Sequence, residues 1–442
     1  MGCARYFSKL TVAYFLLTFM TAVPAISVQF QWINDHEMRV DTFSYLKGVV
    51  FIPWAVKPLF ALIPKNAAMI GACVGQLLTC VLLLAPMGLY ELVAMLLLFQ
   101  VFVVMIDVHI DGWMLTELTA VDRGELQSRT MIFKTIGGTC GSLSGALIYH
   151  YVHDRIAFAV SSICACLILI LYLLPSESAR EAAEIVVIEL GGSVGSSTIE
   201  VTPVEMTPAE VVEVTEVATK VERGSHKYFA CFVFLLFLQP SVASAVLYYT
   251  QKILGVTDVE FGILSVVSGF AAVVAQLLYS LVLRRCPLTL SVSVGISGAT
   301  VLSLSFIVCL RLGIPVIPLL IAQSFIGCIL DVMVTMPVTV RAAKITKEYS
   351  RPVVMYALVT SVMNLCGITS MEVGAFITHV VSPDHLNLDR LTTLLYIEEL
   401  FAFIPLLALL AQAAVSRYKM RAAAATYVTG EDAADSTEAE WT

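Results

Sequence analysis

The stretch VFVVMIDVHIDGWMLTELT, residues 101–119, is typical of a membrane-spanning helix that also carries charge. Acids inside a span are costly, so they are usually kept for a substrate, a proton or an ion pair. On a helix, Asp107 and Asp111 lie one turn apart on one face, whereas His109 is rotated by about 200° from Asp107. This geometry argues against a three-ligand metal site and predicts a pair of carboxylates that faces a cavity.

The rest of the chain has the composition of a membrane protein. Of its 442 residues, 58% are hydrophobic and 14% are charged, whereas a soluble domain has about 25% charged residues. The apolar residues fall in blocks of roughly twenty, the length that crosses about 30 Å of hydrocarbon. We therefore expect an all-α protein embedded in a lipid bilayer, with spans near 10–32, 43–64, 67–87, 90–117, 128–151, 155–175, 227–249, 259–283, 288–310, 313–341, 353–381 and 391–415.

One long connection divides these twelve spans into six and six. We expect a six-helix bundle over 1–175, a linker over 176–226, a second six-helix bundle over 227–416 and an acidic tail over 417–442. The linker is acidic and of low complexity, which favours disorder.

The distribution of lysine and arginine predicts how the chain is oriented. With the N-terminus inside, eighteen cations fall on the cytoplasmic side and six on the outer side, where we count Lys47; Lys57 and Lys134 stay within spans. Cytoplasmic loops carry the excess of positive charge in membrane proteins. We therefore expect both termini, the linker and the tail to be cytoplasmic, most simply at the plasma membrane, with an organelle as the alternative.

The two halves also repeat each other. The sequence ILDV at 329–332 follows MIDV at 105–108 by 224 residues, which places Asp331 where Asp107 lies in the first half. Together with six-plus-six spans, this echo predicts two parallel repeats of the major facilitator type, with a substrate site near the midplane.

Several classes of protein are disfavoured. The eleven cysteines show neither a disulfide framework nor a Cys-x-x-Cys zinc pattern. No basic patch carries interleaved aromatic residues, so we expect no nucleic-acid partner. We also find no nucleophile constellation, and an intramembrane aspartyl enzyme would place its two aspartates on separate helices. We therefore expect no catalytic residues, no metal and no cofactor.

Five stretches resemble the folate–biopterin transporter family, a branch of the major facilitator superfamily. They are FIPWAVKPLFALI (51–63), IDVHIDG (106–112), LQSRTMIFKTIGG (126–138), LYYTQKILGVTDVEFGILSV (247–266) and SVMNLCGITSMEVGAFIT (361–378). The chain departs from the family at ALIPKN (61–66) and at Ser350-Arg351-Pro352. The resemblance implies a secondary active transporter that carries a folate or pterin by alternating access. The acids within spans favour a proton as the coupling ion.

A pterin ring offers an N–H and an amino group side by side, and one carboxylate accepts from both. Asp107 or Asp111 fits this role, and the alternative is that one of them only pairs with Lys57 or Lys134. Lys57 suits the carboxylates of a folate, or alternatively keeps an aspartate charged. Lys134, beside the helix-packing residues Gly137, Gly138 and Gly141, is the other cation of the expected substrate site.

Trp54 and Trp113 complete the expected substrate site by sandwiching a flat heterocycle, although packing alone would also explain them. Further charges are candidates for coupling or gating: Asp331 and Glu372 as protonatable acids within spans, and Glu117 and Arg341 near cytoplasmic ends.

Other functions stay open at this stage. The same carboxylates would suit another polar metabolite, such as S-adenosylmethionine, a nucleoside or an amino acid. A membrane sensor that transports nothing is the second alternative.

Overall fold

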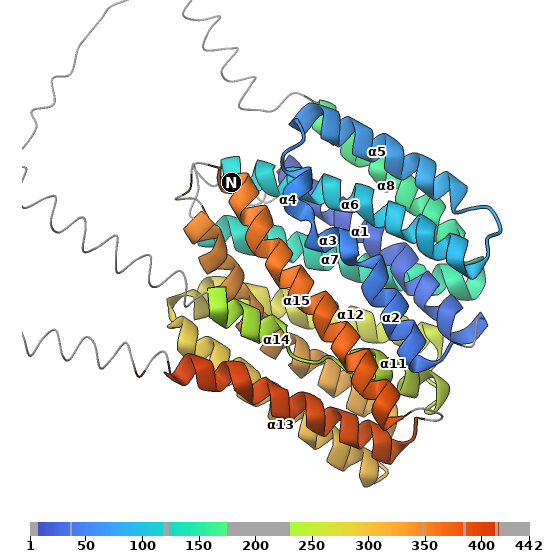
Figure 1. The fold of residues 1–442 in the computed structure, drawn as a ribbon, viewed down its shortest axis with the longest axis vertical. Helices are drawn as coiled ribbons and strands as arrows, with labels where there is room; N and C mark the ends of the chain where they lie inside the picture. The colour runs from blue at the N-terminus through green and yellow to red at the C-terminus, as the bar shows by residue number, and fades with distance from the viewer. Residues whose placement is uncertain are drawn as a thin grey trace, which may run out of the picture.

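The computed structural model describes residues 8–35, 38–117, 123–174, 230–346, 349, 351–382, 386–411 and 414. Figure 1 shows the blue-to-green helices as one group and most of the yellow-to-red helices as another beside it. The expected linker over 176–226 and the tail over 417–442 lie outside the described residues, and their cytoplasmic location stays a prediction.

The first half contains eight α-helices and a short π-helical extension of the first, η1 (Gln31–Asp35), among the described residues. The α-helices are α1 (Lys9–Phe30), α2 (Val40–Val50), α3 (Ile52–Ala55), α4 (Lys57–Phe60), α5 (Lys65–Leu82), α6 (Leu89–Glu117), α7 (Arg123–Tyr151) and α8 (Ile156–Leu173).

The second half begins with a helix over 230–237. It continues with α11 (Ala243–Lys252), α12 (Asp258–Leu281), the 3-10 turn η2 (Leu283–Arg285), α13 (Leu288–Arg311), α14 (Val316–Thr346) and α15 (Pro352–Val381). Its last described long helix covers Leu388–Ala411.

Ten of the helices in the described part of the chain are long and apolar enough to cross a membrane. The other two expected spans are present as broken helices: the second consists of α2, α3 and α4, and the seventh of 230–237 followed by α11. Proline causes both breaks, because it lacks the N–H that continues a helix. Pro53 and Pro58 interrupt the second span, and Pro240 the seventh.

Other helices satisfy the backbone groups freed at the seventh span. Ser241 donates its backbone N–H to the carbonyl of Ser370 on α15 at 3.1 Å. Val242 donates its backbone N–H to Oε1 of Glu398 at 3.2 Å. Such partners make irregular backbone tolerable at membrane depth.

Three glycines spaced by four residues let α7 lie against α1. A Cβ atom added to Gly137 would meet the carbonyl oxygen of Phe15, and one added to Gly141 would lie 2.8 Å from that of Phe19. Gly145 meets α1 in the same way, at Val23. Small residues at such spacing allow close helix contact in membranes, and here they hold Lys134, one turn before Gly137 and Gly138, beside α1.

We predict that Gly141→Ala destabilises the protein by about 1–3 kcal/mol, the usual range for overpacking. Gly138→Ala is the matched control, because nothing lies within 4 Å of an added Cβ at that position. The melting temperature of the detergent-purified variants measures the difference. Equal melting temperatures would show that the α1–α7 contact tolerates a side chain.

The two halves meet mainly along two lines of helix contact. The helix α12 packs along α7, and α15 packs along α2, α3 and α4 (Figure 1). Polar contacts cross both lines. Gln276 donates to Thr135 Oγ1 at 2.7 Å, and His379 Nδ1 lies 2.8 Å from Asp41 Oδ2.

Candidate functional site

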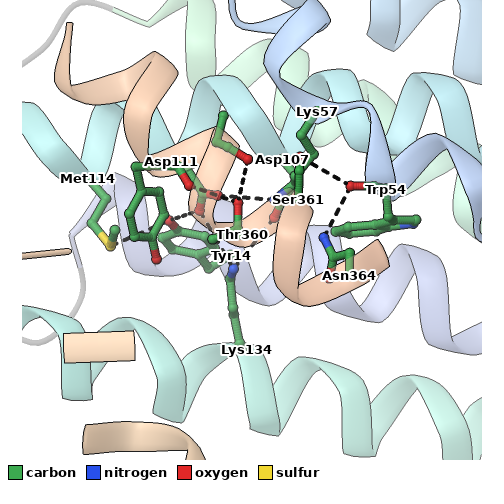
Figure 2. Close-up of polar contacts among 12 residues, drawn as sticks. Tyr14, Trp54, Lys57, Asp107, Asp111, Met114, Lys134, Thr360, Ser361 and Asn364 are labelled. Carbon is green, nitrogen blue, oxygen red and sulfur yellow. Dashed lines mark hydrogen bonds and ion pairs between the residues drawn. The ribbon is translucent and has the colours of Figure 1, made fainter. Parts of the chain in front are cut away.

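Four charged side chains meet inside the first half. Asp107 and Asp111 come from α6, Lys57 from α4 and Lys134 from α7. The Lys57 ammonium forms a short ion pair with Asp107 and lies 3.4 Å from Asp111. The Lys134 ammonium lies 3.5 Å from Asp107 and 3.7 Å from Asp111. Figure 2 shows the two lysines approaching the aspartates from opposite sides of the view.

This charge cluster (Lys57, Asp107, Asp111 and Lys134) carries no net charge and is largely shielded from solvent. Lys57 is 3% exposed, Asp107 2% and Asp111 6%, whereas the Lys134 side chain is 24% exposed. Removing one partner of a buried ion pair leaves an uncompensated charge, which costs far more than removing the whole pair. The cluster therefore depends on all its members together.

The break in the second span determines where Lys57 lies. A regular helix would pair the carbonyl of Trp54 with the N–H of residue 58, which a proline does not have. Asn364 Nδ2 on α15 donates to this carbonyl instead, at 3.3 Å, and Ser361 Oγ lies 3.5 Å from it. The Pro-Trp-x-x-Lys-Pro and Ser-x-x-Asn stretches of the sequence thus form one contact between the two halves (Figure 2).

A tyrosine that sequence reasoning missed completes the cluster. Tyr14 on α1 donates its hydroxyl to Asp111 Oδ1 at 2.7 Å, and the Lys134 ammonium lies 4.3 Å from the centre of its ring. Tyr14 is 1% exposed. It lies in the apolar run TVAYFLLT, where nothing distinguishes a tyrosine that packs from one that bonds a charge.

The two tryptophans lie in different surroundings and at a distance from each other. The Trp54 indole N–H donates to Gln100 Oε1 at 2.8 Å, and the Lys57 ammonium lies 5.1 Å from the centre of the Trp54 ring. Trp113 lies on the same helix as Gln100, but roughly 20 Å further along its axis. Trp54 lies on α3 and Trp113 on α6, and in this structure the two indoles lie at different depths.

The remaining expected residues lie outside the cluster. Glu372 on α15 is half-buried and packs against Gly48 on α2, where a Cβ atom would collide with its carboxylate. Arg341 is half-buried near the C-terminal end of α14. Glu117 is the last residue of α6, and its side chain is outside the described residues.

Asp331 lies on α14, outside the cluster and beyond the residues of that helix that line a cavity between the two halves. This cavity of about 580 Å³ is lined from α7 by Thr139 and from α14 by Leu320, Ser324 and Cys328, among others. Asp331 follows these α14 residues at the spacing that keeps to one helix face, and it is exposed.

A second cavity of about 650 Å³ touches the break in the second span. Trp54, Asn364 and Glu398 line it, together with the chain at Gln239 to Ser241. This cavity therefore extends from the break in the second span to the break in the seventh.

The structure is a bundle of membrane-spanning helices in two halves, with neutralised charges and cavities inside, an arrangement typical of membrane transporters. Two solved transporters share the fold. A D-xylose–proton symporter matches with a TM-score of 0.66 at 14% identity, over 91% of this chain and 95% of that one. A POT family transporter in complex with 5-aminolevulinic acid matches with a TM-score of 0.60 at 14% identity, over 93% and 96%.

The family follows from the sequence match. The model of the BT1 family matches residues 19–423, and this chain belongs to that family. It is also 23% identical over 399 residues to the folate–biopterin transporter of Synechocystis sp. (strain ATCC 27184 / PCC 6803 / Kazusa), covering 86% of this chain and 76% of that protein. The expected all-α fold of the major facilitator type, with two six-helix halves, is confirmed.

Proposed function

We propose that this transporter carries a folate or a pterin by alternating access, driven by a proton. The name of the Synechocystis relative supports the substrate class. The structural observation that carries the proposal is the neutral, buried charge cluster, because a proton or a ligand on one of its carboxylates would upset this balance and so favour a rearrangement of the helices that hold it.

In this proposal Asp111 is the group that meets the substrate ring. It shares both lysines with Asp107, at the longer distances of 3.4 and 3.7 Å, so its bonds are the easier ones to exchange. A pterin edge offers two neighbouring donors, which a carboxylate accepts together. Lys57 and Lys134 then keep Asp107 ionised, and Trp54 presents an aromatic face to the neighbouring cavity.

Proton coupling is proposed for the acids within spans. A proton on Asp107 or Asp111 would release a lysine and so change the contacts among α4, α6 and α7. Glu372 lies where α15 packs on α2 and would sense the separation of the halves. Asp331, on the same helix as residues that line the cavity between the halves, is the second candidate. For Glu117 and Arg341 we propose a gating role.

An uptake panel in a transport-deficient host tests this function. Labelled folate or biopterin is expected to accumulate above the empty-vector level, to do so faster as the external pH falls, and to stop doing so with a protonophore. Labelled S-adenosylmethionine is expected to stay at the background level.

Other results would replace parts of the proposal. Uptake that is insensitive to pH and to a protonophore but requires sodium would show that sodium is the coupling ion. Uptake of S-adenosylmethionine alone would show that this compound, and not a folate or pterin, is the substrate. Absence of counterflow for every compound in proteoliposomes would indicate a sensor.

A further inference from the structure

A cavity next to the charge cluster contains a lysine that the cluster does not use. The cavity has a volume of about 170 Å³ and lies among α1, α2 and α6, where its lining includes Thr21, Gln29, Trp32, Phe43, Lys47 and Gln100. Gln100 precedes Asp107 by two turns on the same face of α6, which places the cavity roughly 10 Å from the cluster.

Lys47 differs from the other two lysines inside this half. Lys57 and Lys134 both lie within 4 Å of Asp107 and Asp111. Among the described residues, by contrast, no carboxylate forms an ion pair with Lys47. The sequence predicts an outer-side cation at this position, whereas the structure places Lys47 two turns into α2 and in the wall of the cavity.

The same cavity contains a second unused donor. Trp32 is 3% exposed, and its indole N–H has no hydrogen-bond partner within the described part of the chain. An ammonium group donates three hydrogen bonds and accepts none, and an indole only donates. A buried donor without a partner is costly, so these two groups together call for an acceptor that carries negative charge.

We infer that this cavity binds a carboxylate of the substrate and that Lys47 is the residue that selects it. A cavity of about 150 Å³ is large enough for benzene, so this one takes one end of a substrate rather than a whole pterin conjugate. The inference rests on the proposed function for the identity of that substrate. Folate carries a glutamate with two carboxylates and biopterin carries none, so Lys47 would favour the conjugated substrate.

Binding to the purified, full-length protein tests the inference directly. The probe is 4-aminobenzoyl-glutamate, which has the carboxylates of folate but no pterin ring. Its dissociation constant is expected to rise at least tenfold in Lys47→Met and by a smaller factor in Lys47→Arg, which keeps the charge. Lys252→Met is the matched control and is expected to bind like the wild type, because Lys252 is exposed at the end of α11.

Uptake gives a second readout. In Lys47→Met the KM for folate is expected to rise at least tenfold, while the KM for biopterin stays within twofold of the wild-type value. If Lys47→Met does not yield folded protein, Lys47→Gln replaces it, since glutamine retains a donor but no charge.

Each outcome bears on the inference. Equal binding of the probe by wild type and Lys47→Met, or no binding by wild type at millimolar concentration, would overturn it, even if folate is transported. Binding that depends on Lys47 in a protein that transports neither folate nor biopterin would support the carboxylate site and overturn the proposed function instead.

Discussion

Lys57→Ala is expected to abolish uptake and to lower the amount of folded protein that reaches the membrane. The substitution leaves Asp107, which is 2% exposed, with Lys134 as its remaining ion-pair partner at 3.5 Å. Breaking a buried pair in this way costs about 3–5 kcal/mol, a large share of the stability of a domain.

The two lysines are expected to differ. Lys134→Ala removes the longer contacts of a side chain that is 24% exposed, and water can partly replace it. We therefore expect Lys134→Ala to retain more folded protein than Lys57→Ala. The monomeric fraction in gel filtration of detergent extracts measures this, and the reverse order would contradict the assignment of Lys57 as the central cation.

A disulfide between the two halves is expected to stop transport reversibly. Ala146 on α7 and Gly262 on α12 belong to different halves, and a Cβ atom on Gly262 would lie 3.0 Å from that of Ala146. Disulfides join Cβ atoms about 3.5–4.5 Å apart, so a small shift allows the bond. Alternating access requires the halves to separate at each end in turn, and the Ala146→Cys/Gly262→Cys bridge prevents this at one end.

The expected readout is loss of nearly all uptake after oxidation and recovery with a reductant. Each single cysteine variant, treated in the same way, is the control for oxidation of the native cysteines. Wild-type uptake by fully cross-linked protein would mean that this contact does not open during transport.

The sequence sufficed to predict the fold and the members of the charge cluster. Apolar blocks of membrane-spanning length predict helices directly, and charges inside such blocks must find partners. This is why Lys57, Lys134, Asp107 and Asp111 could be selected without a structure. The distances between these four side chains could not be predicted from the sequence, because three separate helices determine them.

Features that depend on contacts between helices were not predictable. Tyr14 looks like any aromatic residue in an apolar run, and its role appears only when α1 lies beside α6. Pro53, Pro58 and Pro240 indicate possible breaks, but the partners that make the breaks tolerable, Asn364 and Glu398, are more than a hundred residues away in sequence. Lys47 was counted with the outer cations because sequence gives no depth within a broken helix.

We propose that the charge cluster carries transport and does not only stabilise the fold. Uptake normalised to surface protein tests it across Lys57→Ala, Asp111→Ala and the double variant, with Asp389→Asn as a control because the Asp389 side chain is 85% exposed. We predict that the double variant regains surface expression, since one charge of each sign is gone, but remains inactive at every substrate concentration. Wild-type uptake in the double variant, or in Asp107→Asn with Asp111→Asn, would contradict it.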